Sequence, residues 1–234
     1  MRVALVSPYS WTYPGGVTRH IEALRAELDR AGHEVTVLAP FDADDRRTAI
    51  LHRGARPQQR EVPEWLVPLG GTFGFPSNGA VSNLAGHPSA ALRLRRALEG
   101  GAFDVVHIHE PVAPVVGWDA LTSANAPIVG TFHCYSENVP SQTIAKLLGA
   151  RRKLNHLHVR IAVSEAAAWT GKRFYGGRYR VIPNGVVLPD GGVPAPRGRA
   201  PRCTSAATRL SRSYGASTRT SWPPATSSLP RASM

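Results

Sequence analysis

Histidines gather where this 234-residue chain is expected to end its buried strands. His107 and His109 belong to the apolar run 103–109, and His133 ends the run 128–133. Buried strands have little use for imidazole, whereas ligands of open α/β sheets bind at the carboxyl ends of the strands. An imidazole there can hydrogen-bond a substrate or exchange a proton near neutral pH. We expect His133 to be catalytic, keep His109 as a further candidate, and interpret His107 as structural.

The pair Gly15-Gly16 precedes a predicted helix. Without Cβ atoms, backbone can approach a diphosphate closely, and a helix N-terminus adds unpaired N–H groups and the positive end of its dipole. A plain turn before a helix is the alternative. Glu110 and Ser164 also follow predicted strands and are kept as candidate site residues, Ser164 being in addition the expected cap of a helix from Glu165.

Two common kinds of site are excluded. A nicotinamide dinucleotide site lacks G-x-G-x-x-G after the first strand, and the second strand ends Leu38-Ala39-Pro40 without an acidic residue for a ribose. A metal site at His107-x-His109-Glu110 is disfavoured because alternation along a strand sends adjacent side chains to opposite faces. We therefore expect no metal and no cofactor.

Strands and helices alternate before residue 190. Short apolar runs predict strands at 3–6, 35–38, 103–109, 128–133, 160–163 and 179–182. Apolar residues spaced by three and four predict a helix over 17–31 that Gly32 ends, and further helices are expected at 89–98, at 141–158 and from 165. Segment 40–88 is rich in turn signals and is interpreted as a long loop. This order predicts an α/β fold with a Rossmann-like, doubly wound parallel sheet.

The composition changes sharply near residue 190. The formal net charge is +12, and residues 191–234 contain seven arginines, no acidic residue and few large aliphatic residues. Such a segment cannot bury enough apolar surface to offset its ordering entropy. We predict one domain over 1–188 and a disordered basic tail over 189–234. A native tail and an out-of-frame reading of the gene both explain it, and its few aromatic residues argue against nucleic-acid binding.

Cysteine and hydropathy indicate the compartment. The chain has two cysteines, Cys134 and Cys203, and its N-terminal apolar run is interrupted by Pro8. No disulfide framework, signal peptide or membrane span is therefore expected. The predicted location is the cytoplasm, with a peripheral position at the inner membrane face as a further expectation.

Five motifs, taken in order, resemble family-4 glycosyltransferases, most of all the phosphatidylinositol mannosyltransferases of actinobacteria. They are Pro8-Tyr9-Ser10 with Pro14-Gly15-Gly16-Val17 and His20, the run 103–111, Gly130-Thr131-Phe132-His133, the run 160–164, and the run 181–186. The resemblance covers residues 1 to about 188. It implies one half of a GT-B fold and retaining transfer of a sugar from a nucleotide sugar to a hydroxyl acceptor, with lipid and inositol types among the candidates.

The resemblance also implies roles for individual residues. The Gly16 backbone N–H would contact the donor's diphosphate, and His133 would contact the donor sugar. Tyr9 would line the acceptor pocket, and Asn78-Gly79 would lie in the loop that holds the acceptor's polar head. Arg93, Arg95 and Arg96 fall where relatives carry a basic patch for anionic lipid, with a solvated helix face as the alternative.

This sequence departs from the mannosyltransferases on the acceptor side. Thr18 replaces a longer amide side chain, Cys134 replaces a hydroxyl residue, and Asn83 replaces an arginine near the lipid phosphate. Nothing after Asp190 resembles the family's second domain, which neutralises the leaving diphosphate and holds the nucleotide sugar. We therefore expect this chain to be inactive by itself. A non-catalytic acceptor- or lipid-binding module is the alternative function.

Overall fold

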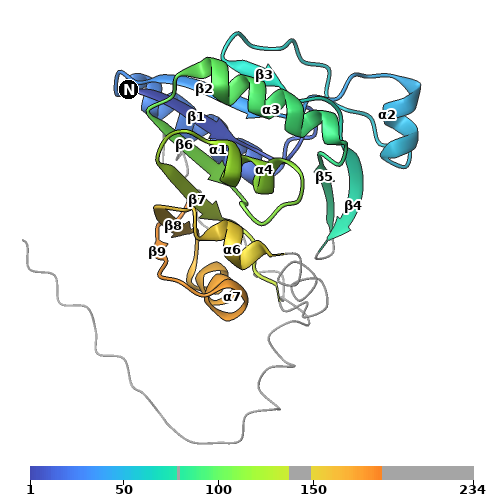
Figure 1. Cartoon of the computed structure of the whole chain (residues 1–234). Coiled ribbons are helices and arrows are strands. Elements are labelled where there is room, and N and C mark those ends of the chain that lie inside the picture. Colours follow the sequence, from blue (N-terminus) through green and yellow to red (C-terminus); the bar gives the residue numbers. More distant parts are fainter. Residues whose placement is uncertain (78–79, 137–148, 186–234) are drawn as a thin grey trace, which may run out of the picture. The chain divides into compact units, whose positions relative to one another are not determined.

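A parallel seven-stranded sheet forms the centre of the computed structural model, which describes residues 1–77, 80–136 and 149–185 (Figure 1). The strands are β1 (Arg2–Val6), β2 (Glu34–Ala39), β3 (Leu66–Pro68), β6 (Val105–His109), β7 (Ile128–Phe132), β8 (Val159–Ala162) and β9 (Arg180–Val181). Their order in the sheet is β3-β2-β1-β6-β7-β8-β9, and every neighbouring pair is parallel. The predicted Rossmann-like, doubly wound α/β fold is thus confirmed, and its strand order reverses between β1 and β6.

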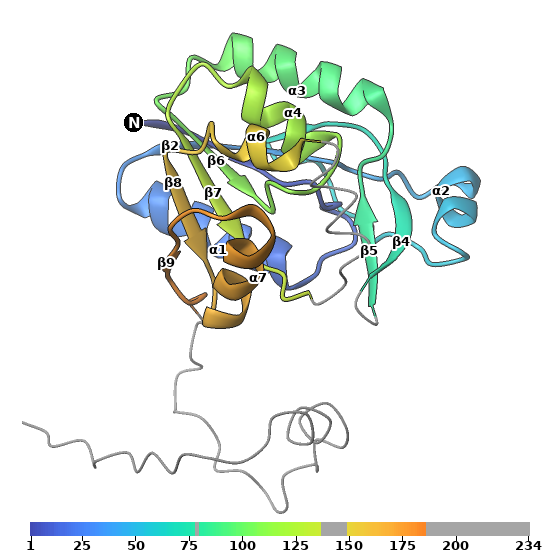
Figure 2. The ribbon, with the colours of Figure 1, turned by 60° about the horizontal axis from the view of Figure 1, so that its bottom comes forward.

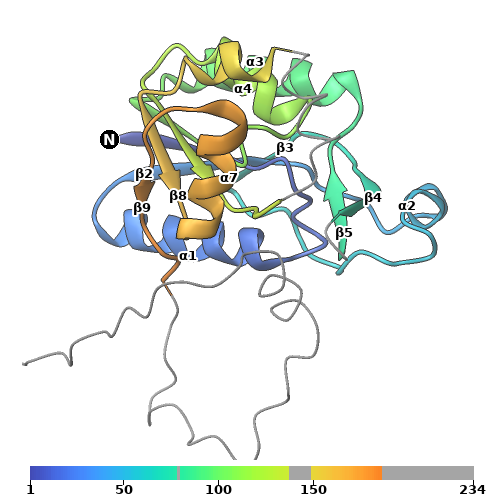
Figure 3. The same ribbon diagram turned by 90° about the horizontal axis from the view of Figure 1, so that it is seen from below.

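Helices cover both faces of this sheet. They are α1 (Gly16–Arg30), α2 (Arg46–Leu51), α3 (Pro88–Gly101), α4 (Val116–Ser123), α6 (Ala150–Leu154) and α7 (Glu165–Tyr175). Figure 3 shows α1 below the sheet and α3 and α4 above it. The core is divided in the same way, because Ile21 of α1 packs with Val3, Leu5 and Val37, whereas Leu94 of α3 packs with Val6 and Ile108.

Local sequence explains where the helices begin and end. Gly32 follows α1 with a φ of +81°, a left-handed conformation that glycine adopts without steric cost. Helix α3 starts with Pro88, whose missing N–H would have no partner in a first turn. The Ser164 hydroxyl accepts the N–H of Ala167 at 3.1 Å and caps α7, as the sequence predicted.

Segment 40–88 is not the long loop expected from its turn residues. It contains α2, β3 and an antiparallel hairpin, β4 (Phe73–Ser77) and β5 (Ala80–Leu84), which stands apart from the main sheet (Figure 2). Glycine and proline interrupt the apolar alternation of β4, so periodicity does not reveal the strand. The Asn78-Gly79 pair lies between these two strands and outside the described residues.

Two other predictions extend beyond the described chain. Of the predicted helix 141–158, the described part is helical at Ala150–Leu154 and turns at residues 155 and 156. The predicted tail, 189–234, lies outside the described residues. Among the described helices, none combines the length and the apolar character needed to cross a bilayer.

Candidate functional site

A cavity of about 270 Å³ opens beyond the carboxyl end of β1, at the reversal of strand order. It is lined by Tyr9, Tyr13, Gly15, Gly16, Val17, Thr18, Val81, Ser82, Asn83 and Cys134. The hairpin is held against the loop after β1 by a bridge between Tyr9 and Leu84 and by a 3.0 Å hydrogen bond from the Ser10 N–H to the Asn83 carbonyl. The cavity therefore combines the loop before α1, the start of α1, strand β5 and the residue after His133.

The start of α1 presents its backbone to this cavity. Gly15, its N-cap, makes no side-chain capping bond, and the first turn holds no acidic residue. A Cβ added at Gly16 would meet no atom within 4 Å, and Gly16 does not have a positive φ. The backbone conformation therefore does not require glycine at this position. The missing side chain leaves space beside the unpaired N–H groups of the helix N-terminus.

Four histidines from three elements meet beside the cavity. His107 and His109 lie on the same face of β6, with ring centroids 4.4 Å apart. The Nδ1 atom of His109 is 3.0 Å from Nε2 of His133, which follows β7. His20 of α1 approaches the rings of His109 and His133 edge-on, with centroids 5.6 and 5.4 Å away. The two candidates at the strand ends, His109 and His133, are therefore hydrogen-bonded to each other.

Burial keeps these imidazoles neutral at neutral pH. It lowers the pKa of His107 to about 4 and that of His133 to about 3, with smaller contributions from the neighbouring histidines. Burial also lowers the pKa of His20 and, much more strongly, that of His109. His133 is consequently a neutral hydrogen-bonding group rather than a cation.

Glu110 holds the loop after β7 through a hydrogen bond to its backbone. Its carboxylate is buried and accepts the backbone N–H of His133 at 3.0 Å. Burial raises the pKa of Glu110, while hydrogen bonds from His133 and Cys134 act in the opposite direction. The Glu110 carboxylate and burial raise the pKa of the Cys134 thiol to about 12, and that thiol lies 3.9 Å from the Tyr9 hydroxyl. Glu110 therefore positions the loop beside the cavity, and Cys134 is an uncharged thiol.

The histidines also offer a potential metal geometry that the sequence did not reveal. Ring nitrogens of His20, His109 and His133 lie within 4.8 Å of one another. The argument against a metal considered only β6, whereas His133 follows β7 and His20 belongs to α1. The hydrogen bond between Nδ1 of His109 and Nε2 of His133 links two of these rings without an ion, and the absence of a metal stays a prediction.

Several predicted residues lie away from the cavity. Ser164 serves as the cap of α7. Arg93, Arg95 and Arg96 are exposed on α3, where Arg95 makes a two-pronged ion pair with Asp119 of α4. This pair compensates one of the three charges of the predicted membrane patch.

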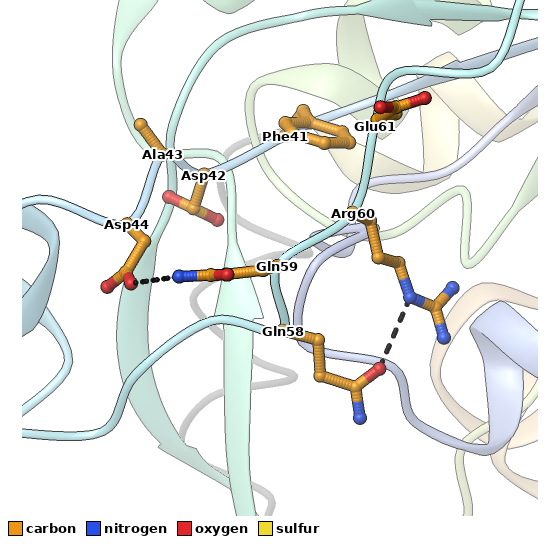
Figure 4. A pocket seen from close by; sticks show the side chains of 8 residues that line it. All are labelled: Phe41, Asp42, Ala43, Asp44, Gln58, Gln59, Arg60 and Glu61. Carbon is orange, nitrogen blue, oxygen red and sulfur yellow. Dashed lines mark hydrogen bonds between the residues drawn. The ribbon is translucent and has the colours of Figure 1, made fainter.

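A larger hollow of about 440 Å³ lies between the loop after β2 and residues 58–61 (Figure 4). Its polar side chains bond to one another, Gln59 to Asp44 at 3.3 Å and Arg60 to Gln58 at 3.2 Å. None of the residues predicted to bind substrate lines it.

Tyr13 and His52 were not predicted from the sequence to lie at or near the cavity. The Tyr13 ring lines it and stacks on His52, with centroids 4.4 Å apart. His52 in turn bonds Asn83 of the hairpin at 2.9 Å. These contacts depend on the hairpin, so no local pattern could have identified them.

Known proteins are similar in sequence to most of this chain. The model of Glycosyltransferase Family 4 matches residues 14–188. The chain is similar to the phosphatidyl-myo-inositol mannosyltransferase of Mycolicibacterium smegmatis, with 37% identity over 187 residues, 80% of this chain and 44% of that protein. The enzyme of the same name from Propionibacterium freudenreichii subsp. shermanii is 34% identical over 190 residues, 81% of this chain and 48% of that protein.

Among solved structures, Anabaena HepE in complex with UDP is 25% identical with a TM-score of 0.46, covering 80% of this chain and 44% of that one. The chain spans about half the length of the curated relatives it matches.

Proposed function

Because the chain belongs to glycosyltransferase family 4, we propose that it forms the acceptor-side half of a retaining glycosyltransferase. The whole enzyme would transfer a sugar from a nucleotide sugar to a hydroxyl acceptor. The described domain is one Rossmann-like half of the GT-B fold, and its cavity lies at the reversal of strand order.

The observation that carries this proposal is the uncapped N-terminus of α1. It has no side-chain cap and no acidic residue in its first turn, and it faces a cavity that also contains Tyr9. A helix end of this kind attracts an anion through its N–H groups and its dipole. We assign the donor's diphosphate to Gly15 and Gly16.

His133 is assigned to the donor sugar beside that diphosphate. Its backbone is fixed by Glu110 and its ring by His109, so two independent bonds determine where the imidazole lies. A neutral imidazole held in this way can hydrogen-bond a sugar hydroxyl without adding a charge. The developing charge on the leaving diphosphate would be met by the helix N-terminus, in the manner of other preorganised electrostatic sites.

Tyr9 is assigned to the acceptor, and Asn78-Gly79 stays a proposal for its polar head. Tyr9 lines the cavity close to Cys134, and its hydroxyl is uncharged because burial raises its pKa. The exposed residues Arg93 and Arg96 of α3 would orient the enzyme toward an anionic membrane surface, where each basic residue contributes about 1 kcal/mol. This orientation would suit a lipid acceptor.

Transfer activity of a chimera tests the assignment. Residues 1–185 would be fused to the second half of the M. smegmatis relative and supplied with nucleotide sugars. Gly16→Val places a branched side chain in the open space beside the N–H groups, and we expect it to weaken donor binding at least tenfold, since each charge-assisted hydrogen bond contributes about 1.5–3 kcal/mol. His133→Ala should abolish transfer.

The matched controls are Gly100→Val and His156→Ala, which change the same residue types at exposed positions elsewhere. Unaltered donor affinity in Gly16→Val, measured by titration calorimetry, would remove the diphosphate from this helix. Transfer at the unsubstituted rate in His133→Ala would remove that residue from the catalytic assignment.

A further inference from the structure

The hydrogen bond between His109 and His133 can be formed in two ways. Nδ1 of His109 lies 3.0 Å from Nε2 of His133. A neutral imidazole carries one hydrogen, on one of its two nitrogens, and accepts through the other. Burial lowers the pKa of both rings, so both are neutral at pH 7.5. One ring must therefore donate to the other, and the direction of donation also determines which of the two outer nitrogens, Nε2 of His109 or Nδ1 of His133, carries a hydrogen.

The outer nitrogen of His109 distinguishes the two directions. This atom, Nε2, is buried and has no hydrogen-bond partner among the described residues, and the residue as a whole is 0% exposed. If His133 donated, Nε2 of His109 would carry a hydrogen, and that N–H would be buried without an acceptor. Buried N–H groups of the backbone are left unpaired more rarely than acceptors are, and we apply the same order to imidazole. The structure therefore favours a hydrogen on Nδ1 of His109 and none on its Nε2.

The side chains around His109 supply no acceptor for an N–H at Nε2. His107 stacks on the ring with an angle of 23° between the planes, so it presents a face, and its own Nε2 is 2.7 Å from the Thr131 hydroxyl. The carboxylate of Glu110 accepts the backbone N–H of His133. Both polar neighbours are thus engaged elsewhere, and the only hydrogen bond of the His109 ring within the described chain is the one to His133.

The same direction of donation determines what His133 can offer a ligand. Its Nε2 accepts from His109, so its single hydrogen lies on Nδ1. His133 is only half-buried, and no hydrogen bond of the described part of the chain uses Nδ1. This outer nitrogen is a donor without a partner at the edge of the cavity, and an oxygen lone pair is the group that complements it.

We propose that His109 is a positioning residue that holds His133 as its Nδ1–H tautomer, so that His133 donates a hydrogen bond to an oxygen of the donor sugar. The inference rests on the proposed function, because it takes the sugar to lie at His133. His109 does not touch the sugar and acts only through the neighbouring ring. It does for His133 what a buried hydrogen-bond partner does for any histidine whose outer nitrogen faces a substrate.

The tautomers can be measured on the protein without any substitution. The 234-residue chain, labelled with ¹⁵N in its histidines, is studied at pH 7.5 by a long-range ¹H–¹⁵N correlation, which shows which nitrogen of each ring carries the hydrogen. We expect Nδ1–H for both His109 and His133. The exposed His156 is the reference for the balance of tautomers in water. A hydrogen on Nε2 of either His109 or His133 would overturn the proposal.

Substitutions of His109 test whether it determines the tautomer of its neighbour. His109→Leu removes the donor, and His133 should then show the same balance of tautomers as His156. His109→Asn restores a donor, since its amide N–H can replace the imidazole N–H, and His133 should return to Nδ1–H. His107→Leu is the matched control, because His107 lies on the same face of β6 without a hydrogen bond to His133. A His133 tautomer that is unchanged in His109→Leu would contradict the role of His109.

The consequence for sugar transfer is measured in the chimera described above. His109→Leu should lower kcat about tenfold or more and leave the KM for the acceptor unchanged, because a histidine in the wrong tautomer cannot make its bond in the transition state. His109→Asn should recover most of that loss. Equal losses of kcat in His109→Leu and His107→Leu, without recovery in His109→Asn, would reduce His109 to a packing residue.

The tautomer and the sugar transfer can fail separately. If the chimera transfers no sugar but both rings carry Nδ1–H as expected, the proposed function fails and the hydrogen-bond direction stands. If transfer occurs and depends on His133 but either ring carries its hydrogen on Nε2, the proposed function stands and this inference fails.

Discussion

The histidine cluster should make the protein unstable in mild acid. A histidine whose pKa is lowered by folding binds fewer protons in the folded than in the unfolded state between its folded pKa and about 6.5. Stability therefore rises with pH in that window, is complete above about pH 6.5, and is lost as the pH falls. The folded values of about 4 for His107 and about 3 for His133 set the lower end.

The magnitude follows from these values. Each such histidine contributes about 1.4 kcal/mol per pH unit, so one that stays neutral down to pH 4 costs about 3 kcal/mol between pH 6.5 and 4. Two of them would remove about 6 kcal/mol, within the range of about 5–15 kcal/mol that is the total stability of typical domains. A domain at the lower end of this range would unfold near pH 4 without denaturant.

Urea unfolding of the chain at pH 7.5, 6.5, 5.5 and 5.0, followed by tryptophan fluorescence, measures this slope. His133→Asn should reduce it by about 1.4 kcal/mol per pH unit. His156→Asn changes an exposed histidine and is the matched control. Equal slopes in the two variants would refute the reasoning, as would a free energy of unfolding that does not change between pH 6.5 and 5.

Glu110 changes the pH dependence of stability in the direction opposite to the histidines, so its contribution must be measured separately. Its folded pKa is raised by burial, so the folded state holds a proton that the unfolded state has released, and stability falls as the pH rises through the folded pKa. Glu110→Gln removes this contribution while keeping an acceptor for the His133 N–H. The acid slope of the histidines should then be steeper in Glu110→Gln than in the unsubstituted chain.

Three further substitutions test features of the fold. Ser164→Ala should destabilise the domain by about 1 kcal/mol, since it removes the cap of α7. Gly130→Ala should cost about 1–3 kcal/mol, because the added Cβ would lie 2.8 Å from Leu157 side-chain atoms in the core. Arg95→Ala should lower the melting temperature more than an ordinary surface substitution, since it leaves the buried carboxylate of Asp119 without its two-pronged partner.

Differential scanning calorimetry with matched variants checks these three. Gly100→Ala adds a Cβ that meets nothing within 4 Å, and it should leave the melting temperature unchanged or raise it. Arg96→Ala removes an exposed arginine from the same helix as Arg95. A Gly130→Ala protein as stable as Gly100→Ala, or equal effects of Arg95→Ala and Arg96→Ala, would contradict the packing described above.

Periodicity was sufficient for six of the seven strands of the sheet, but it revealed neither β3 nor helix α4. The apolar run at 3–6 and the helical spacing from Val17 to Ala31 describe β1 and α1 to within one or two residues. Gly32 could be identified as the end of α1 because the positive φ that ends a helix is adopted by a single residue, usually glycine. These predictions were correct because each depends on neighbours a few positions apart.

Contacts between distant segments could not be predicted in this way. His20 of α1 meets His109 at the end of β6 and His133 after β7, and no spacing in the sequence encodes that meeting. His52 is hydrogen-bonded to Asn83 of a hairpin whose glycine and proline interrupt the apolar alternation of its strands. Gly15 and Gly16 at the start of α1 could therefore be selected from the sequence as cavity residues, whereas the contacts of the hairpin could not.

The hairpin has a consequence for how such enzymes diversify. Strands β4 and β5 pair with each other and not with the main sheet, and they enter the chain between β3 and α3. Insertions, deletions or substitutions there can reshape one side of the cavity while the strands that carry the histidines keep their register. Under the function proposed above, an evolving lineage, or an engineer grafting hairpins from one homologue to another, would exchange acceptors through this small module and leave the start of α1 unaltered.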